Sequence, residues 1–288
     1  MAKYTSFNYL QFKDNYNKSD YFSTGEKIIM GILNITEDSF YDGGKYLQPK
    51  NIITQVKKML DNGASIIDIG AQSTKPNAIS KGPHEETKIL LPTIKLLKNK
   101  FKDLFISVDT YWSEVAEKAI KSGGNMVNDV SAGNIDSNMF KLISKLQVPY
   151  VLMHMKGKPE NMQNNPNYKN VVGEVYTFFE KKIRDLENLG FNKIILDPGF
   201  GFGKNLNHNY SLLNNLHEFK KLNYPILVGA SRKSMIYKLL NISPEKALNG
   251  TSIINTIALK NGADILRVHD VKEAIECVKI TNFIKNIN

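Results

Sequence analysis

Residues 27–69 contain three segments that predict the fold: KIIMGIL at 27–33, IITQVKKML at 52–60 and SIIDI at 65–69. The first and third segments are short, apolar and rich in isoleucine, as buried strands are. The middle segment places its apolar residues at helical spacing. A strand, a helix and a second strand in this order predict a βαβ unit with parallel strands.

The same alternation continues to the end of the chain. The expected strands are 27–33, 65–69, 104–108, 126–127, 149–153, 193–196, 225–228 and 264–268. The expected helices are 52–60, 85–97, 113–121, 139–146, 172–189, 210–219, a broken stretch over 235–259, and 271–284. The chain of 288 residues is close to the roughly 250 typical of one (β/α)8 barrel. The sequence therefore predicts an α/β fold, a (β/α)8 TIM barrel, as a single domain over 1–288, with 1–26 as an N-terminal capping segment.

Composition excludes several classes of protein. Hydrophobic residues make up 42% of the chain, which rules out wholesale disorder. The longest apolar runs are far shorter than the roughly 20 residues of a membrane span, and residues 1–20 lack a signal-peptide hydrophobic stretch. We therefore expect a cytoplasmic protein without a membrane partner. The single cysteine, Cys277, allows no internal disulfide and no zinc cluster.

The net charge of +10 raises the question of nucleic-acid binding. Arginine occurs only at Arg184, Arg232 and Arg267, and the lysines are scattered among many asparagines and isoleucines. A dense basic stripe with interleaved aromatic residues is missing from the sequence. We expect no nucleic-acid partner, although a basic surface would help to attract an anionic substrate.

Polar residues follow nearly every expected strand, at the end of a barrel where active sites form. They are Asn34, Asp68, Asp109, Asn128, His154, Asp197, Ser231 with Lys233, and Arg267 with His269. Arg232 and Arg267 follow the last two strands in a chain that otherwise uses lysine, and a guanidinium binds phosphate or carboxylate through two parallel hydrogen bonds. At least one of these arginines is expected to face an anion, whereas Arg184 is expected on a helix surface.

Two segments resemble known catalytic or phosphate-binding motifs but lack residues that those motifs require. DPGFGFGK at 197–204 lacks the first glycine and the final Ser or Thr of a phosphate-binding P-loop, because Pro198 and Asn205 stand there. GASRK at 229–233 lacks the last glycine of a hydrolase nucleophile elbow. The glycines after Asp197 instead predict a bent loop whose backbone approaches a flat ligand closely. His84, His208 and His217 show no metal-ligand spacing and are expected to be solvent-exposed or capping residues.

Five motifs in order resemble the bacterial dihydropteroate synthase family. They are MGILNITEDSFYDGG at 30–44, STKP at 73–76, DPGFGFGK at 197–204, SRKS at 231–234 and RVH at 267–269. The resemblance implies a (β/α)8 homodimer that condenses 6-hydroxymethyl-7,8-dihydropterin pyrophosphate with p-aminobenzoate and releases pyrophosphate. It also implies Mg²⁺ as the cofactor, with Asn34 as its protein ligand.

The resemblance assigns roles at both ends of the first substrate. Asp109, Asn128, Asp197 and Lys233 are expected to bind the pterin, with Asp109 and Lys233 as the catalytic residues. Asn34, Thr74, Arg267 and His269 are expected to bind the diphosphate. A carboxylate such as Asp197 can accept from the ring NH and the exocyclic amine of a pterin together.

The second substrate is expected to lie beneath mobile loops at 36–44 and 72–82. The p-aminobenzoate residues implied by the resemblance are Thr74, Lys75, Pro76, Phe202 and Ser231, the last of these expected at the start of a helix. One departure stands here, because the family usually has arginine where this chain has Lys75. Gln72, where glutamate is common, is a milder change.

Three other functions are compatible with parts of the sequence. A pterin-binding methyltransferase would share the barrel but has no use for Arg267, His269 and the STKP loop. A non-catalytic barrel with a binding role has only Lys75 in its favour. A nucleic-acid-binding protein would show steeply salt-dependent binding, which the scattered lysines do not favour.

Overall fold

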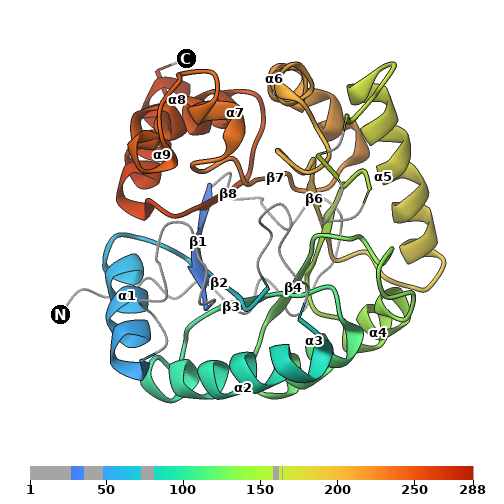
Figure 1. The fold of residues 1–288 in the computed structure, drawn as a ribbon, viewed down its shortest axis with the longest axis vertical. Helices are drawn as coiled ribbons and strands as arrows, with labels where there is room; N and C mark the ends of the chain where they lie inside the picture. The colour runs from blue at the N-terminus through green and yellow to red at the C-terminus, as the bar shows by residue number, and fades with distance from the viewer. Residues whose placement is uncertain (1–26, 36–47, 73–80, 158–161, 164, 288) are drawn as a thin grey trace.

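Eight parallel strands form one sheet that curls into a nearly closed barrel, and helices surround it (Figure 1). The computed structural model describes residues 27–35, 48–72, 81–157, 162–163 and 165–287. The strands are β1 Ile28–Asn34, β2 Ile66–Gly70, β3 Ile106–Asp109, β4 Met126–Asp129, β5 Tyr150–Met153, β6 Ile194–Asp197, β7 Leu227–Val228 and β8 Ile265–Val268. The expected (β/α)8 architecture is confirmed.

Strand order explains how the barrel closes. The order is β6-β5-β4-β3-β2-β1-β8-β7, so each strand pairs with its sequence neighbour and β1 pairs with β8. Between the outermost strands, β6 and β7, a parallel bridge joins Leu196 to Ile226, and the Leu196 N–H donates to the Pro225 carbonyl at 2.8 Å. The last gap is therefore spanned by a short bridge next to the two-residue strand β7.

The helices return the chain from one strand to the next. They are α1 Pro49–Asp61, α2 Pro83–Lys100, α3 Ser113–Lys121, α4 Met139–Leu146, α5 Val171–Glu187, α6 Leu206–Asn214, α7 Ser234–Tyr237, α8 Leu248–Lys260 and α9 Val271–Lys285, with 3₁₀ turns η2 Leu216–Leu222 and η3 Pro244–Lys246. Prolines occupy the first turns of α1 and α2, where their missing N–H costs no hydrogen bond. No helix in the described part of the chain is long and apolar enough to cross a membrane.

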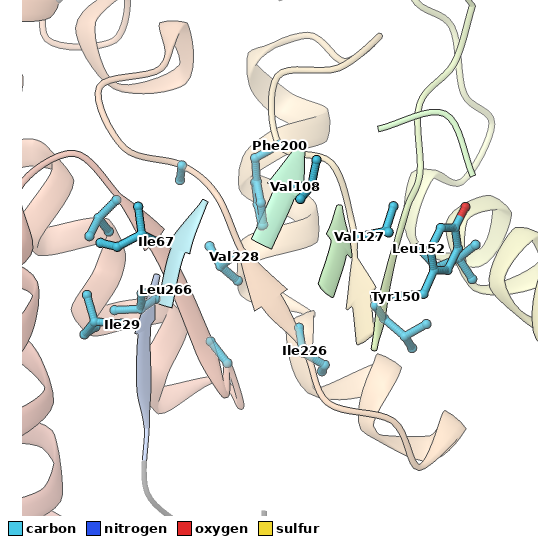
Figure 2. Packing of buried hydrophobic residues seen from close by; sticks show 14 of the residues in the cluster. Ile29, Ile67, Val108, Val127, Tyr150, Leu152, Phe200, Ile226, Val228 and Leu266 are labelled. Carbon is cyan, nitrogen blue, oxygen red and sulfur yellow. The ribbon is translucent and has the colours of Figure 1, made fainter. Parts of the chain in front are cut away.

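Alternation along each strand divides the apolar residues into two sets. In β1, Ile29 belongs to the large cluster between strands and helices, whereas Ile28 and Met30 point into the barrel. Figure 2 shows members of the outer cluster, among them Ile67, packed between sheet and helices. The inward set, which we call the lower layer, fills the barrel. Its members are Ile28, Met30, Ile66, Phe105, Met126, Val151, Ile195, Leu227 and Ile265.

Most expected elements match the structure apart from their ends, but two helical regions differ. The helix expected at 210–219 begins earlier and divides into α6 and η2. Asn205 and His208 form a reciprocal capping box that starts α6 before the apolar periodicity does. The broken stretch at 235–259 resolves into α7, η3 and α8. The capping segment expected at 1–26 and most of both loops expected over the site lie outside the described residues.

Candidate active site

A second set of inward positions lies above the lower layer and is polar. On four strands the polar residue stands two positions after an apolar lower-layer residue, because side chains alternate with a period of two. These pairs are Ile66 and Asp68, Met126 and Asn128, Ile195 and Asp197, and Ile265 and Arg267. Together with Asp109 at the end of β3, we call Asp68, Asn128, Asp197 and Arg267 the upper layer.

Arg267 connects three strands within the upper layer. Its Nε lies 2.6 Å from Asp68 Oδ2, and its Nη2 lies 2.7 Å from Asp109 Oδ2. The Asn128 amide donates to the same Asp68 oxygen at 3.0 Å. Asp68 is fully buried, and it therefore joins two expected substrate-binding groups through one carboxylate.

Asp68 is the residue for which sequence reasoning assigned no role. It stood among the strand-end residues, but no family motif covers it. The available signal was its place at an inward position of a strand whose other inward residue, Ile66, is apolar. A buried carboxylate at such a position needs a cationic or donor partner.

Burial and neighbouring charges have opposing effects on the pKa of Asp109. Burial raises its pKa to about 7, although the Arg267 guanidinium acts to lower the pKa and Asp68 acts to raise it. Gly70 on the neighbouring strand leaves space for this carboxyl, since a Cβ there would lie 3.3 Å from the Asp109 Cβ. The carboxyl is thus poised between its charged and neutral forms near neutral pH.

Asp197 lies at the end of β6, where the loop turns sharply. Its Oδ1 accepts from the Gly199 N–H at 2.8 Å, and burial raises its pKa despite the nearby Lys233. Gly199 and Gly203 have φ of +70° and +62°, and a Cβ would lie 2.0 Å from the His154 carbonyl oxygen or 2.3 Å from the Lys156 carbonyl oxygen. Only glycine fits there, which agrees with the close backbone approach expected of this loop.

Two lysines stabilise the glycine loop from different sides. The buried Lys204 ammonium donates to the carbonyls of His154, Gly199 and Phe202 at 3.2, 2.9 and 3.0 Å, and burial lowers its pKa to about 7. Lys233 donates to the Phe200 carbonyl at 2.8 Å, and its ammonium lies 4.5 Å from the centre of the Phe202 ring. Burial lowers the pKa of Lys233 to about 8, although Asp197 acts to raise it.

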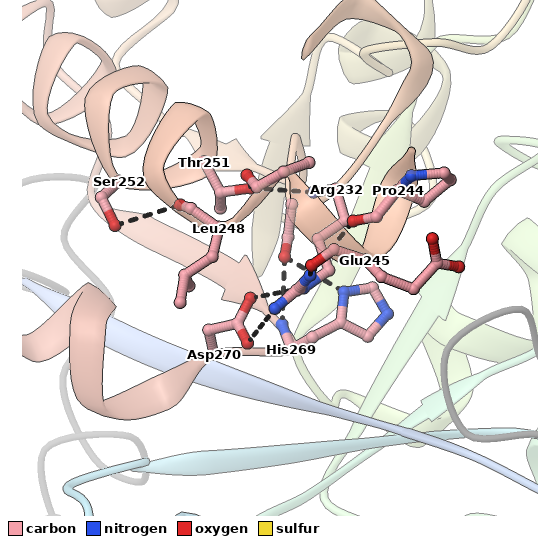
Figure 3. Close-up of polar contacts among 10 residues, drawn as sticks. Arg232, Pro244, Glu245, Leu248, Thr251, Ser252, His269 and Asp270 are labelled. Atoms are coloured by element: carbon pink, nitrogen blue, oxygen red, sulfur yellow. Dashed lines mark hydrogen bonds and ion pairs between the residues drawn. The ribbon is translucent and has the colours of Figure 1, made fainter. Parts of the chain in front are cut away.

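The ends of β7 and β8 meet in the cluster shown in Figure 3. Arg232 forms a two-point ion pair with Asp270, with Nε to Oδ2 at 2.8 Å and Nη2 to Oδ1 at 2.9 Å. Its Nη1 donates to the carbonyls of Pro244 and Glu245 at 3.1 and 2.6 Å. The two candidate arginines therefore differ, because Arg232 holds loops of the chain together while Arg267 lies in the upper layer.

Ser231 is not at the start of a helix, and that expectation is wrong. Helix α7 begins at Ser234, and Ser231 precedes it in a turn. The Ser231 hydroxyl instead lies 3.1 Å from His269 Nδ1 and accepts from the His269 backbone N–H at 3.2 Å. Burial lowers the pKa of His269 to about 4, with Arg267 acting in the same direction.

The remaining expected site residues divide into two groups. Asn34 ends β1 and is partly buried, so it reaches the same edge of the barrel as the upper layer. Thr74, Lys75 and Pro76 lie outside the described residues. Gln72 is described, and its amide donates to Glu86 and to the Lys81 carbonyl, both at 2.7 Å.

The other histidines either pack against aromatic rings, cap a helix or are exposed to solvent. The His154 ring packs edge-on against Phe178 with centroids 4.9 Å apart, so this strand-end residue turns away from the upper layer. His84 and His217 are exposed, and His208 caps α6, as expected. Within the described residues, no group of three or more His, Cys, Asp or Glu side chains forms a metal site.

Comparison with known proteins assigns the class. A family model described as "Pterin binding enzyme" matches residues 30–269. The chain belongs to this family of pterin-binding enzymes. It is 42% identical over 254 residues to dihydropteroate synthase of Escherichia coli K12, covering 88% of this chain and 89% of that protein. It is also 42% identical over 267 residues to that of Clostridium beijerinckii, covering 91% and 96%.

Solved structures agree with the sequence relatives. The dihydropteroate synthase of Yersinia pestis with a sulfonamide drug has a TM-score of 0.87 at 39% identity, covering 92% of this chain and 96% of that chain. The enzyme of Xanthomonas albilineans with 4-aminobenzoic acid has a TM-score of 0.83 at 35% identity, covering 90% and 93%. Within the pterin-binding family the chain belongs to the dihydropteroate synthases, which are transferases of folate synthesis.

Proposed function

We propose that the upper layer is the site where 6-hydroxymethyl-7,8-dihydropterin pyrophosphate condenses with p-aminobenzoate to give 7,8-dihydropteroate and pyrophosphate. The observation that carries the proposal is the network from Asn128 through Asp68 and Arg267 to Asp109, which places acceptors for a flat ring beside a cation for a diphosphate. One relative was solved with 4-aminobenzoic acid and another, 41% identical to this chain, in the presence of pteroic acid. They support the second substrate and a product of the pteroate type.

The ring end of the site would be formed by Asp197, Asn128, Lys233 and Asp109. Asp197 is a buried acceptor whose carboxylate suits the paired NH groups of a pterin. Asn128 both donates and accepts on the ring edge, and Lys233 donates to a ring oxygen or nitrogen. Asp109 in its ionised form would stabilise positive charge at the methylene carbon, which requires a pH near or above the pKa of about 7.

The diphosphate end would be formed by Arg267 and His269, together with Thr74. In the reaction the bond from the methylene carbon to the diphosphate oxygen breaks, and its electron pair leaves with the diphosphate. The amine nitrogen of p-aminobenzoate forms the new bond to that carbon and then loses a proton. Charge-assisted donors stabilise the leaving anion more than the neutral ester oxygen, so Arg267 acts mainly in the transition state.

Asn34 would contribute one ligand to Mg²⁺. Its amide oxygen is a hard donor at the correct edge of the barrel, and the described residues offer its side chain no hydrogen-bond partner, so the residue fits the ion. Bound with diphosphate oxygens and water, the ion would supply positive charge for the leaving group.

The p-aminobenzoate pocket would include Thr74, Lys75, Pro76 and Phe202. The Phe202 ring is buried beneath the Lys233 ammonium, beside the ring end of the site, where a second flat ligand can stack. Ser231, which the resemblance also assigns to this pocket, has its hydroxyl 3.1 Å from His269 Nδ1.

The decisive experiment supplies purified protein with both substrates and Mg²⁺ and follows pyrophosphate and 7,8-dihydropteroate together. We expect the two products in equal amounts, with no 7,8-dihydropteroate when either substrate is omitted. Folded protein that makes no 7,8-dihydropteroate under these conditions would overturn the proposal.

We further propose that the chain forms a homodimer through α8 and α9. These adjacent helices carry exposed apolar side chains, which are Ile253, Ile257, Ile280, Phe283 and Ile284. Sedimentation should give a dimer mass, and Phe283→Asp should shift the protein toward monomer.

Location in the cytoplasm is proposed from the family resemblance, and cell fractionation tests it.

A further inference from the structure

The Ser231 hydroxyl has a specific set of neighbours. It accepts from the His269 backbone N–H at 3.2 Å, and its Oγ lies 3.1 Å from Nδ1 of the same residue. Ser231 is 4% exposed, so its proton has little access to water. Among the described residues the hydroxyl has no other acceptor within hydrogen-bond distance.

This geometry decides the direction of the hydrogen bond. If Nδ1 carried the proton, the Ser231 oxygen would accept twice and its own buried O–H would be left without an acceptor, which is unfavourable for a buried donor. If the hydroxyl donates to Nδ1, every group in the contact is satisfied. The ring proton then resides on Nε2.

An ion pair on the adjacent residues holds this contact in place. Arg232 follows Ser231 and Asp270 follows His269, so their two-point ion pair fixes the two loop ends against each other. Arg232 has a φ of +54°, which a non-glycine residue adopts only when its surroundings require it. Asp270 is the N-cap of α9 yet makes no capping hydrogen bond with its side chain. Where the two loops meet, Arg232 thus adopts an unfavourable backbone conformation, and Asp270 makes an ion pair in place of a helix-capping hydrogen bond.

We propose that Ser231 is a positioning residue that fixes His269 in the Nε2–H tautomer, so that the ring presents a neutral N–H donor to the diphosphate. The inference rests on the proposed function for the identity of the anion. The low pKa of His269, about 4, is consistent with a neutral ring at pH 7, for which the tautomer matters. The other tautomer would place the Nε2 lone pair against a phosphate oxygen, and two acceptors repel.

The first test is the tautomer itself, read from ¹⁵N shifts of the histidine rings in labelled protein at pH 7. We expect His269 as Nε2–H in the wild type, and a mixture or the Nδ1–H form in Ser231→Ala. His208 is an internal control, because the Asn205 backbone N–H donates to its Nδ1 and fixes the same tautomer independently of Ser231. A His269 ring already in the Nδ1–H form, or unchanged by Ser231→Ala, would overturn the proposal.

The second test separates the two substrates. Ser231→Ala should weaken binding of the pterin diphosphate about 5- to 20-fold, while the free hydroxymethyl pterin and the KM for p-aminobenzoate change less than twofold. Ser252→Ala is the matched control, since that hydroxyl on α8 donates to the Leu248 carbonyl at 3.3 Å and does not contact His269. A rise in the KM for p-aminobenzoate alone would assign Ser231 to the second substrate and refute the positioning role.

The two tests also distinguish this inference from the proposed function. Wild-type protein that makes no 7,8-dihydropteroate but shows the Nε2–H tautomer would overturn only the assignment of the reaction. Active wild-type protein with the Nδ1–H tautomer would overturn only the role of Ser231.

Discussion

The lower and upper layers of the barrel interior occupy equivalent positions on the same strands but differ in what they do. Ile195 and Asp197 are two residues apart on β6 and both point inward, as do Ile265 and Arg267 on β8. The lower layer is apolar and fully packed, so its members stabilise the barrel through burial. The upper layer buries carboxylates against one guanidinium, which is an expensive arrangement for stability alone.

An inward orientation therefore does not by itself specify the role of a side chain. The position of the residue along the strand specifies it, because loops from all strands converge only at the carboxyl ends. Changes in the lower layer should therefore reduce the free energy of unfolding and preserve ligand binding. Substitutions in the upper layer should instead weaken ligand binding and leave the free energy of unfolding largely unchanged.

The largest contrast is expected between two substitutions on β6. Asp197→Asn keeps the volume and the acceptor for the Gly199 N–H, but it places a donor opposite the pterin NH groups. Pterin affinity measured by calorimetry should fall at least about 100-fold, or about 3 kcal/mol. Ile195→Ala should instead lower the free energy of unfolding by about 2–5 kcal/mol and change pterin affinity less than threefold. Similar effects of both variants on affinity would contradict the two-layer description.

A smaller but more selective effect is expected at Arg267. Arg267→Lys keeps the positive charge but removes the planar group that reaches Asp68 and Asp109 together. Binding of the pterin diphosphate should weaken about 10- to 30-fold, and binding of the free hydroxymethyl pterin no more than about threefold, because the lost contacts are local to phosphate. Competition binding with the two ligands measures the ratio, and equal losses would remove Arg267 from the diphosphate end.

The pH dependence of stability tests the cost of burying the upper layer. Burial raises the pKa of Asp109 to about 7, so the folded protein holds a proton that the unfolded chain releases between pH about 4 and about 7. The contribution of Asp109 to the free energy of unfolding should therefore fall as pH rises through this window, by at most about 1.4 kcal/mol per pH unit. Burial likewise raises the pKa of Glu86 to about 7, and this residue acts in the same direction as Asp109. His269 acts in the opposite direction up to its ordinary pKa of 6.5, because burial lowers its pKa to about 4 in the folded protein.

Urea unfolding at several pH values checks this expectation. Asp109→Asn should make the slope of the free energy of unfolding against pH more positive than in wild type between pH 4 and 7, by at most about 1.4 kcal/mol per pH unit, because the contribution that falls with pH is removed. Asp61→Asn changes an exposed carboxyl on α1 and serves as the surface control. An unaltered slope in Asp109→Asn would mean that the Arg267 ion pair dominates over burial.

The smallest effect is expected from one added methyl group between the two ends of the site. A Cβ at Gly229 would lie 3.8 Å from Arg267 Cβ and 3.9 Å from Asp197 Oδ2, which is ordinary contact. Gly229→Ala should fold with a free energy of unfolding within about 1 kcal/mol of wild type. It should lower pterin affinity two- to tenfold by occupying ligand space, which corresponds to about 0.4–1.4 kcal/mol. Gly82→Ala is the control, since nothing lies within 4 Å of a Cβ there.

The candidate site was predictable in part, and particular residues show why. Asp109, Asn128, Asp197 and His269 follow expected strands, and Arg267 lies near the end of the last one, so the positions of the strands predict that all five reach one end of the barrel. Ser231 was assigned to a helix start, but its hydroxyl contacts a residue 38 positions later. Asp68 received no role because its partner Arg267 lies 199 positions away.

The barrel, the single-domain architecture and the polar ends of the strands can be predicted from the sequence, because hydrophobic periodicity and strand length are local properties. The pairing of the side chains is visible only in the folded chain. Arg232 and Arg267 look equivalent in the chain, yet Arg232 binds Asp270 and two carbonyls while Arg267 binds the carboxylates of β2 and β3. The physical reason is that these partners meet only when β1 pairs with β8 and the barrel closes.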